Sequence, residues 1–499
     1  MTRPHPTAET MIDVVVVGGG VVGLAVANAL LRADVRVTSV FPPVSDDRPV
    51  ASRAAGAMLG AFGEVTSDGG GIDDPGFRFR LEAQRLYPEW LREVCERAKR
   101  SVHQAKGTFV LANNVGASDR ASVHDMKRRA DHVGEPAHYT DPQDVPGLNP
   151  NQYQAPGLCL YLPNEHSIDP DELLEALAAS AATFSSWTYV PDIADVVRPD
   201  GAAWSVTTLE GRTIQAEHIV LSAGSRSWEV LGVGLREAAG LPEMYFGKGV
   251  SCVVRDAPPI PSTIRTPNRA FACGIHVVPR ADGLLYLGAT NNLGADHEIE
   301  RGMQPGELHN LFDEILHQIN TDIRESRIAE LRVGFRPIAA HGRPIIGTSA
   351  LPGLSVGTGT YRDGVLMAPL VGAIVAGEIT GADGWTNPFP VTIESTTPDR
   401  DALVEMGIRD IVSFLQEPRG ELPYDRAEQL RKYVTTLFRM AIDDDGRYFV
   451  LRDEMQRRLR EAPLNETMHK IFCDVIEYTD KLEYTDKDEP AKWDGPELG

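Results

Sequence analysis

A glycine-rich segment near the start of the chain has the residue types and spacing that bind a diphosphate. Gly18, Gly20 and Gly23 directly follow an unbroken run of valines at residues 14–17. The run predicts a strand buried on both faces, as in the centre of a parallel sheet. Gly18 allows a tight turn, Gly20 lets backbone amides approach a pyrophosphate, and Gly23 lets the next helix pack against the strand. The segment favours a dinucleotide site, although buried valines followed by glycines also occur in ordinary α/β domains.

The residues around this segment complete a strand–helix–strand unit. A helix is predicted over about residues 22–32 and a second strand over residues 35–40. The acidic residue that commonly ends the second strand and binds the ribose hydroxyls is missing, because residues 38–41 have the sequence Thr-Ser-Val-Phe. We therefore expect the hydroxyl of Ser39, or backbone close to it, to hold the ribose.

Composition excludes several functional classes. The 499 residues carry a formal net charge of −22, which argues against a nucleic acid or an anionic membrane as a partner. The length predicts two or three domains. The five cysteines form no C-x-x-C pair, so neither a disulfide framework nor a metal site is indicated. A polar leader and the absence of an apolar run of roughly 18 residues predict a cytoplasmic protein without a membrane span.

Other elements must position this site. A long amphipathic helix is predicted over about residues 75–100, and another helix begins after Asp169, which caps it, with Pro170 in the first helical position. Between residues 247 and 290 several strands follow one another without helices, which implies an antiparallel sheet and a second domain. Beyond residue 334 the sequence becomes glycine-rich again, which indicates that the chain returns to the cofactor.

Taken in order, these segments resemble the flavin-dependent amino acid and amine oxidases, a family that includes glycine oxidase and D-amino acid oxidase. The resemblance covers about residues 11–380. Collinearity of many segments is far more specific than any single motif. Besides the opening glycine motif, the matching segments are residues 52–59, 165–170, 223–228, 278–290, 334–337 and 361–369.

The resemblance implies a mixed fold, α/β together with α+β. It consists of a discontinuous Rossmann-like FAD-binding domain and an antiparallel substrate sheet that covers the flavin. The expected FAD-binding segments are residues 1–105, 155–232 and 334–392. The expected substrate-binding segments are residues 106–154 and 233–333.

The last fifth of the chain, residues 393–499, lies beyond the resemblance. Three apolar stripes at helical spacing predict a C-terminal α-helical extension, with helices near residues 404–415, 430–441 and 468–476. Their apolar faces need a surface to pack on. That surface would belong to the oxidase body, to another subunit of a homo-oligomer or to a partner protein.

FAD is the cofactor that the resemblance implies. The chain has one dinucleotide motif, and the glycine cluster at residues 357–364, which in the family lies near the isoalloxazine ring, does not repeat its spacing. Some sarcosine oxidases attach their flavin covalently through a cysteine. Here Cys473 lies outside the matched region, so the resemblance implies non-covalent binding. The residues expected to bind the cofactor are Gly18, Gly20, Val22, Gly23, Ser39, Ser52, Arg53, Ala54, Ala55, Gly56, Met58, Ala223, Gly224, Trp228, Arg336, Gly359, Tyr361, Arg362, Asp363, Gly364 and Val365.

Three side chains are candidates for substrate binding and catalysis. A guanidinium holds a planar carboxylate with two parallel charged hydrogen bonds. Arg336 matches the family position that binds the substrate carboxylate, and Arg362 matches one at the active-site entrance or beside the flavin, although most arginines lie on protein surfaces. His276 falls in register where glycine oxidase has a carboxylate-binding tyrosine. Imidazole can also donate to a carboxylate, and a strand histidine that faces solvent is the alternative. Lys248 could place a charge near the flavin or sit at a domain junction.

The chemistry implied is hydride transfer from the carbon that bears the amine to the flavin. The resulting imine hydrolyses to an oxo acid, and O2 reoxidises the flavin to give H2O2. The substrate would be a small amino acid or an N-substituted glycine, although the histidine at position 276 puts glycine itself in doubt. Two alternatives keep the fold: a dehydrogenase that passes electrons to a carrier, and a flavin-bearing scaffold whose C-terminal helices bind a partner.

Overall fold

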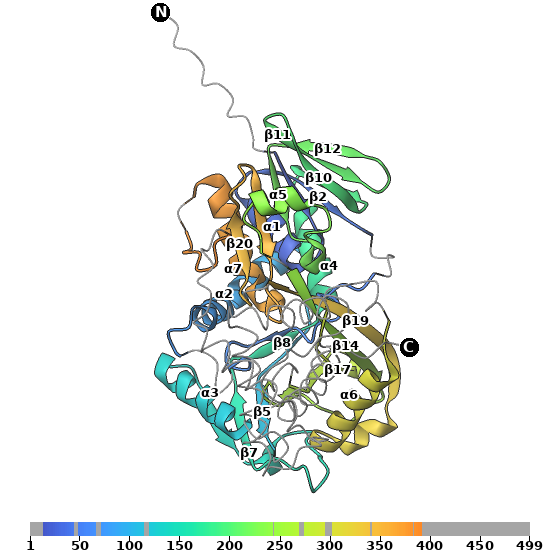
Figure 1. Cartoon of the computed structure of the whole chain (residues 1–499). Helices are drawn as coiled ribbons and strands as arrows, with labels where there is room; N and C mark the ends of the chain where they lie inside the picture. The colour runs from blue at the N-terminus through green and yellow to red at the C-terminus, as the bar shows by residue number, and fades with distance from the viewer. Residues whose placement is uncertain are drawn as a thin grey trace, which may run out of the picture.

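The structure is a computed structural model. It describes residues 13–43, 48–65, 71–113, 119–242, 244–268, 274–294, 302–339, 342–382 and 384–391. Two halves, each built on a large sheet, lie one above the other in Figure 1. This arrangement confirms the predicted mixed fold with a Rossmann-like half and a largely antiparallel half. The three helices predicted within residues 393–499 lie outside the described residues.

The first half contains a six-stranded sheet in the order β20-β21-β13-β1-β2-β9. Neighbouring strands are parallel except β20 and β21. The predicted strand–helix–strand unit is confirmed as β1, α1 and β2, whereas β9 was not predicted. The elements are β1 (Asp13–Val17), α1 (Val21–Arg32), β2 (Arg36–Phe41), β9 (Trp187–Pro191), β13 (His218–Leu221), β20 (Ile345–Thr348) and β21 (Leu354–Thr358).

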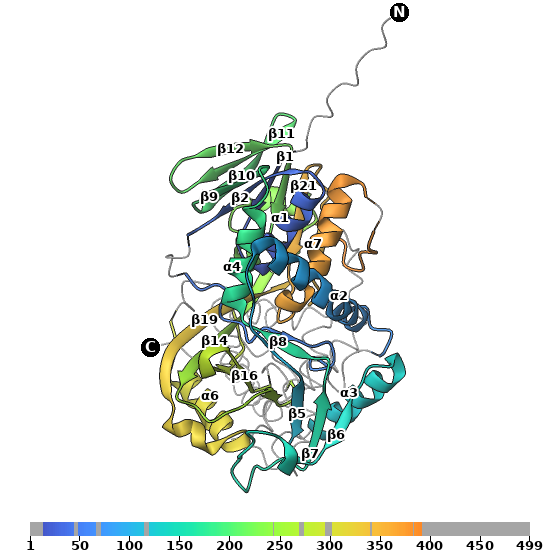
Figure 2. The same cartoon turned by 180° about the vertical axis from the view of Figure 1, so that it is seen from behind.

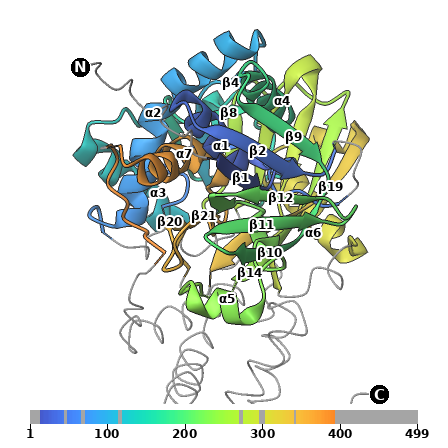
Figure 3. The same cartoon turned by 90° about the horizontal axis from the view of Figure 1, so that it is seen from above.

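Alternate valines of β1 enter two different apolar cores. Val14 and Val16 pack among the helices, whereas Val15 and Val17 pack on the other face of the sheet. Because both faces are buried from Val14 to Val17, this part of β1 is apolar throughout. The helical layer, which faces the viewer in Figure 2, consists of α1, α2 (Pro75–Ala98), α4 (Pro170–Ala181) and α7 (Gly364–Thr380). The opposite face is covered by β10 (Ala194–Asp200), β11 (Ala203–Thr208), β12 (Thr213–Ala216) and α5 (Val233–Ala238), as Figure 3 shows.

The cap predicted for α4 is present. The side chain of Asp169 accepts hydrogen bonds from the backbone N–H groups of Asp171 and Glu172, at 3.0 and 3.1 Å, and Pro170 occupies the first helical position. These contacts satisfy amides that have no partner within the helix. No helix in the described ranges is long and apolar enough to cross a bilayer.

The second half contains a nine-stranded sheet in the order β18-β14-β17-β16-β15-β5-β7-β6, with β19 also paired to β14. Neighbours are antiparallel except β15 and β5. Helix α6 (Pro305–Gln318) covers one face of this sheet and α3 (Asp119–Val133) the other. The strands are β5 (Thr108–Ala112), β6 (His138–Thr140), β7 (Leu158–Leu162), β14 (Met244–Arg255), β15 (Thr263–Arg265), β16 (His276–Pro279), β17 (Leu285–Gly288), β18 (Asn292–Gly294) and β19 (Arg327–Ala339).

The sheet pairing places two segments differently from the expected domain division. Strand β7 lies within the segment 155–232 assigned to the FAD-binding domain, yet it pairs with β5 along its whole length. Residues 334–339, assigned to the same domain, are the end of β19 and pair with β14. Both segments belong to the antiparallel sheet, because that sheet satisfies their backbone hydrogen bonds. A small sheet of β3 (Met58–Leu59), β8 (His166–Ile168) and β4 (Gln104–Ala105) lies between the halves.

Candidate active site

One cavity of about 440 Å³ lies where the two halves meet. Its wall combines the end of β1, the start of α1, the loop after β13, strands β14 and β19, and the start of α7. Fourteen of the predicted site residues line it, from segments that are far apart in the chain. They are Gly18, Gly20, Val22, Ser52, Arg53, Ala54, Ala55, Ala223, Gly224, Arg336, Tyr361, Arg362, Gly364 and Val365.

Backbone forms the end of the cavity nearest β1. Gly18 has a φ of +121°, which side chains rarely allow, and a Cβ there would lie 2.3 Å from the carbonyl oxygen of Ser222. A Cβ at Gly23 would lie 2.1 Å from the carbonyl oxygen of Gly18. Glycine at both positions therefore lets α1 begin directly against β1. The amino end of α1 faces the cavity, where its partial positive charge suits a diphosphate.

The side chain of Ser52 caps the amino end of α1. Its Oγ accepts a hydrogen bond from the backbone N–H of Val21 at 3.0 Å. The N-cap residue itself is Gly20, which has no side chain to make this contact. The segment of residues 52–59, which carries part of the family resemblance, is thus attached to the same helix end as the glycine motif.

Ser39 does not line the cavity, which corrects the expectation that its hydroxyl holds the ribose; the alternative, backbone close to Ser39, stays open because Val40 and Phe41 do line the cavity. It is buried, and its Oγ accepts a hydrogen bond from Nε1 of Trp187 at 3.0 Å. Trp187 belongs to β9, the strand that was not predicted. The hydroxyl therefore bonds within the sheet and does not reach the cofactor site.

At the end of β2, where related folds commonly have the ribose-binding carboxylate, this chain has an aromatic residue. Phe41 ends β2, and a Cβ at Gly19 would lie 2.3 Å from its ring. The ring also packs on Tyr189, with 4.4 Å between the ring centroids. The carboxylates that do line the described cavity, Asp195 and Glu229, come from later segments of the chain.

Other predicted cofactor residues also lie behind the wall. Trp228 is buried and donates from Nε1 to the carbonyl oxygen of Pro242 at 2.8 Å, so its role is in the core. Asp363 forms an ion pair with Arg80 at 3.4 Å. Burial raises the pKa of Asp363 to about 6, against the opposing effect of Arg80. The remaining predicted residues that do not line the cavity are Gly23, Gly56, Met58 and Gly359.

Arg336 lies at the other end of the cavity, on β19. Its Nη1 donates to the carbonyl oxygen of Thr290 and to Oδ1 of Asn291, both at 3.0 Å. Both acceptors are neutral, and none of the acidic residues that the structure describes forms an ion pair with Arg336. On β14, a Cβ at Gly249 would lie 2.3 Å from Nη2 of Arg336, so glycine there makes room for the guanidinium. A charged group with only neutral partners is suited to bind an anion.

The structure contradicts the donor role expected of His276. The ring is 4 % exposed, so the solvent-facing alternative is also wrong. Its Nδ1 lies 2.8 Å from the carbonyl oxygen of Gly274. A carbonyl can only accept, so Nδ1 carries the proton of the neutral ring and Nε2 has none to donate. Burial, reinforced by the charges of Arg265 and Arg336, lowers the pKa of His276 to about 3, which keeps the ring neutral.

Lys248 points away from the cavity. Successive side chains of a strand point to opposite faces, and glycines at 247 and 249 occupy the cavity face of β14. The Nζ of Lys248 pairs instead with Glu307 of α6 at 3.0 Å, and both side chains are buried. This position agrees with the interpretation of Lys248 as a structural residue at a junction.

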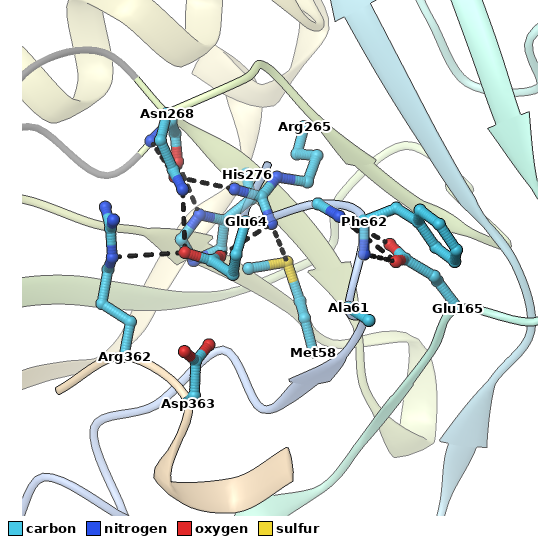
Figure 4. Close-up of polar contacts among 12 residues, drawn as sticks. Met58, Ala61, Phe62, Glu64, Glu165, Arg265, Asn268, His276, Arg362 and Asp363 are labelled. Carbon is cyan, nitrogen blue, oxygen red and sulfur yellow. Dashed lines mark hydrogen bonds and ion pairs between the residues drawn. The ribbon is translucent and has the colours of Figure 1, made fainter. Parts of the chain in front are cut away.

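An ion network that was not predicted lies beside Arg362 (Figure 4). Glu64 accepts hydrogen bonds from Nδ2 of Asn268 at 2.8 Å and from Nη1 of Arg265 at 3.2 Å, and it pairs with Nε of Arg362 at 3.3 Å. Burial opposes ionisation of Glu64, but Arg362 and Arg265 outweigh it and lower the pKa of Glu64 to about 2. The one local sequence feature that points to this network is Gly63, because a Cβ at that position would lie 2.7 Å from Nη1 of Arg265.

The Rossmann-like half has a glycine turn at the start of a helix, and the antiparallel sheet carries an arginine that borders the same cavity. This combination defines the class of FAD-dependent oxidoreductases. The chain belongs to the family described as FAD dependent oxidoreductase, whose model matches residues 13–378. FAD is therefore its cofactor, and the glycine turn, the amino end of α1 and Ser52 fit the diphosphate of that molecule.

Sequence similarity to individual proteins supports membership of this family. The chain is 28% identical over 368 residues to glycine oxidase from Geobacillus kaustophilus, covering 73% of this chain and 92% of that protein. It is 26% identical over 373 residues to the bifunctional protein ThiO/ThiG of Trichormus variabilis, covering 73% of this chain and 52% of that protein.

Solved structures show the same fold. The crystal structure of glycine oxidase from Geobacillus kaustophilus matches with a TM-score of 0.66 and 26% identity, covering 77% of this chain and 98% of that one. Iminodiacetate oxidase from Chelativorans sp. BNC1 matches with a TM-score of 0.62 and 20% identity, covering 76% of this chain and all of that one (100%).

Proposed function

We propose that this enzyme oxidises the C–N bond of a small amino acid or an N-substituted glycine. The substrate gives up a hydride and a proton and becomes an imine, which water hydrolyses to an oxo acid and an amine or ammonia. O2 is the final electron acceptor and is reduced to H2O2. The observation that carries the proposal is Arg336, a guanidinium in the cavity wall whose described partners are all neutral.

Arg336 binds and orients the substrate through its carboxylate. Its place on β19, paired with β14, fixes the guanidinium relative to the cavity and so fixes the carbon that bears the amine. When bound, FAD supplies the hydride acceptor. A substrate amine that arrives neutral needs no strong general base, so we assign none. The similarity to glycine oxidase supports this class of substrate.

We also propose that FAD is held without a covalent bond. The amino end of α1 and Ser52 would hold its diphosphate. Asp195, which lines the cavity, is our candidate for a ribose-hydroxyl acceptor in place of the acid that β2 lacks.

The test replaces Arg336 and compares substrates with and without a carboxylate. The FAD-loaded protein is mixed anaerobically with glycine, N-methylglycine, small D-amino acids and the methyl ester of each, and bleaching of the flavin absorbance is followed. We expect the wild type to be reduced by acids and only weakly by esters. Arg336→Met should lower kcat/KM for acids by about 100-fold, or about 3 kcal/mol, and leave that for esters nearly unchanged.

Arg327→Met is the matched control. Arg327 lies on the same strand, but it pairs with Asp256 on the surface at 2.8 Å and does not line the cavity. Its loss should leave both kinds of substrate unaffected. Normal oxidation of acids by Arg336→Met would contradict the assignment. Reduction of the flavin without subsequent reoxidation by O2 would contradict the oxidase part alone.

A further inference from the structure

The two arginines in the cavity wall differ in their charged partners. Arg336 has only neutral partners among the described residues, whereas Arg362 is paired with Glu64. A carboxylate ligand therefore encounters one guanidinium with neutral partners and one that already has a carboxylate, Glu64, beside it.

Direct contacts connect the two arginines. Oδ1 of Asn291 accepts from Arg336, and Nδ2 of the same residue donates to the hydroxyl of Tyr361. The guanidinium of Arg362 lies over the ring of Tyr361, 4.8 Å from its centroid. The two guanidiniums thus flank one pair of side chains and border the same cavity.

Glu64 is held firmly enough to act as a fixed charge. Its side chain is 12 % exposed, and that of Arg265, with which it pairs, is 3 % exposed. The loop that carries Glu64 is anchored in turn by buried Glu165, which accepts from the backbone N–H of Gly63 at 3.2 Å (Figure 4). At such a buried position, a charge acts on its neighbours more strongly than at the surface.

We propose that Glu64 makes the cavity select substrates by their charge. The cavity then accepts amines with one carboxylate and rejects those with a second anionic group. This inference rests on the proposed function in one respect, which is that Arg336 binds the first carboxylate. A second anionic group directed towards Arg362 would approach the negative charge of Glu64. Because like charges repel when they are brought together in an interface, Glu64 disfavours a dicarboxylate relative to a monocarboxylate.

Glu64→Gln separates charge from shape. Glutamine has the size of glutamate and retains an acceptor oxygen, but it removes one negative charge beside Arg362 and Arg265. Asp125→Asn is the matched control, because Asp125 is also a buried acid, 4 % exposed, between two arginines, Arg128 and Arg129. It lies on α3, and no residue of α3 lines the cavity.

The experiment measures binding of ligands that cannot be oxidised. The full-length, FAD-loaded protein is titrated with acetate and with malonate, and Kd is obtained from the change in flavin absorbance and by calorimetry. We expect the wild type and Asp125→Asn to bind acetate more tightly than malonate. Glu64→Gln should shift the ratio of the two Kd values towards malonate by about tenfold or more. Adding Arg362→Gln to Glu64→Gln should abolish that shift.

Two results would overturn the proposal. One is a wild type that binds malonate more tightly than acetate, which needs no variant at all. The other is a folded, FAD-loaded Glu64→Gln protein with an unchanged Kd ratio. Neither depends on turnover, so failure of every amino acid to reduce the flavin would defeat the proposed function and leave this measurement interpretable.

Discussion

The two ends of the cavity are built in different ways. At the nucleotide end, backbone and small side chains surround the start of α1, as Gly18, Gly23 and Ser52 show. At the substrate end, charged side chains from distant segments meet, as Arg362 and Glu64 show. The first end depends on close approach of main chain and the second on balance of charge. Substitutions at the first should therefore change whether FAD binds, and those at the second should change which ligands bind and at which pH.

The largest effect is expected from Gly18→Val. The added side chain would collide with the carbonyl oxygen of Ser222, 2.3 Å from the Cβ position, and valine resists the φ of +121°. We expect a loss of at least about 3 kcal/mol in stability or FAD binding. The ratio of flavin to protein after purification measures it. Gly234→Ala, at a position with open space around the Cβ, should retain FAD as the wild type does.

His276→Asn should change how stability depends on pH at the substrate end. His276 stays neutral in the fold down to its pKa of about 3, whereas an unfolded histidine takes up a proton below about 6.5. The unfolded state therefore binds more protons between these values, and the contribution of His276 to stability is lost as pH falls through that window, by at most about 1.4 kcal/mol per pH unit.

Asparagine can still donate to the carbonyl oxygen of Gly274 but does not titrate. The free energy of unfolding of His276→Asn, relative to that of the wild type, should thus rise as pH falls from 6.5 towards 4.5. Urea unfolding of the FAD-saturated proteins at several pH values measures this difference. Parallel curves for the two proteins would show that His276 is not the buried neutral base described above.

The smallest effects are expected from a pair of serines. Ser52→Ala removes the cap on the Val21 amide and should weaken FAD binding and stability by about 1 kcal/mol. Ser39→Ala removes only the acceptor for Trp187, so stability should fall by about 1 kcal/mol while FAD affinity stays unchanged. Titration of the apoproteins with FAD distinguishes the two. An equal loss of FAD affinity in both variants would restore Ser39 as a cofactor ligand.

Local patterns allowed most of the nucleotide end to be predicted. The valine run, the glycines at 18 and 23 and the Asp169 cap each follow from a few adjacent residues, and the structure contains all three. The resemblance to the oxidase family predicted that Arg336 and Arg362 border the site, and both line the cavity.

Side-chain pairing between distant segments could not be predicted in this way. No spacing rule connects Glu64 with Arg265, or Ser39 with Trp187, because the sheets bring these residues together. The same limit explains His276. Its position in the strand was predicted, but its tautomer depends on Gly274 and its neutrality on burial.

Strands β14 and β19 pair from Met244 opposite Ala339 to Arg255 opposite Arg327, and they extend from one half of the molecule into the other (Figure 1). Such a ladder resists bending, because any hinge between the halves would have to break several interstrand hydrogen bonds at once. Ligands should therefore reach Arg336 without separation of the halves. Amide protons in the middle of this ladder should exchange with solvent among the slowest of the molecule.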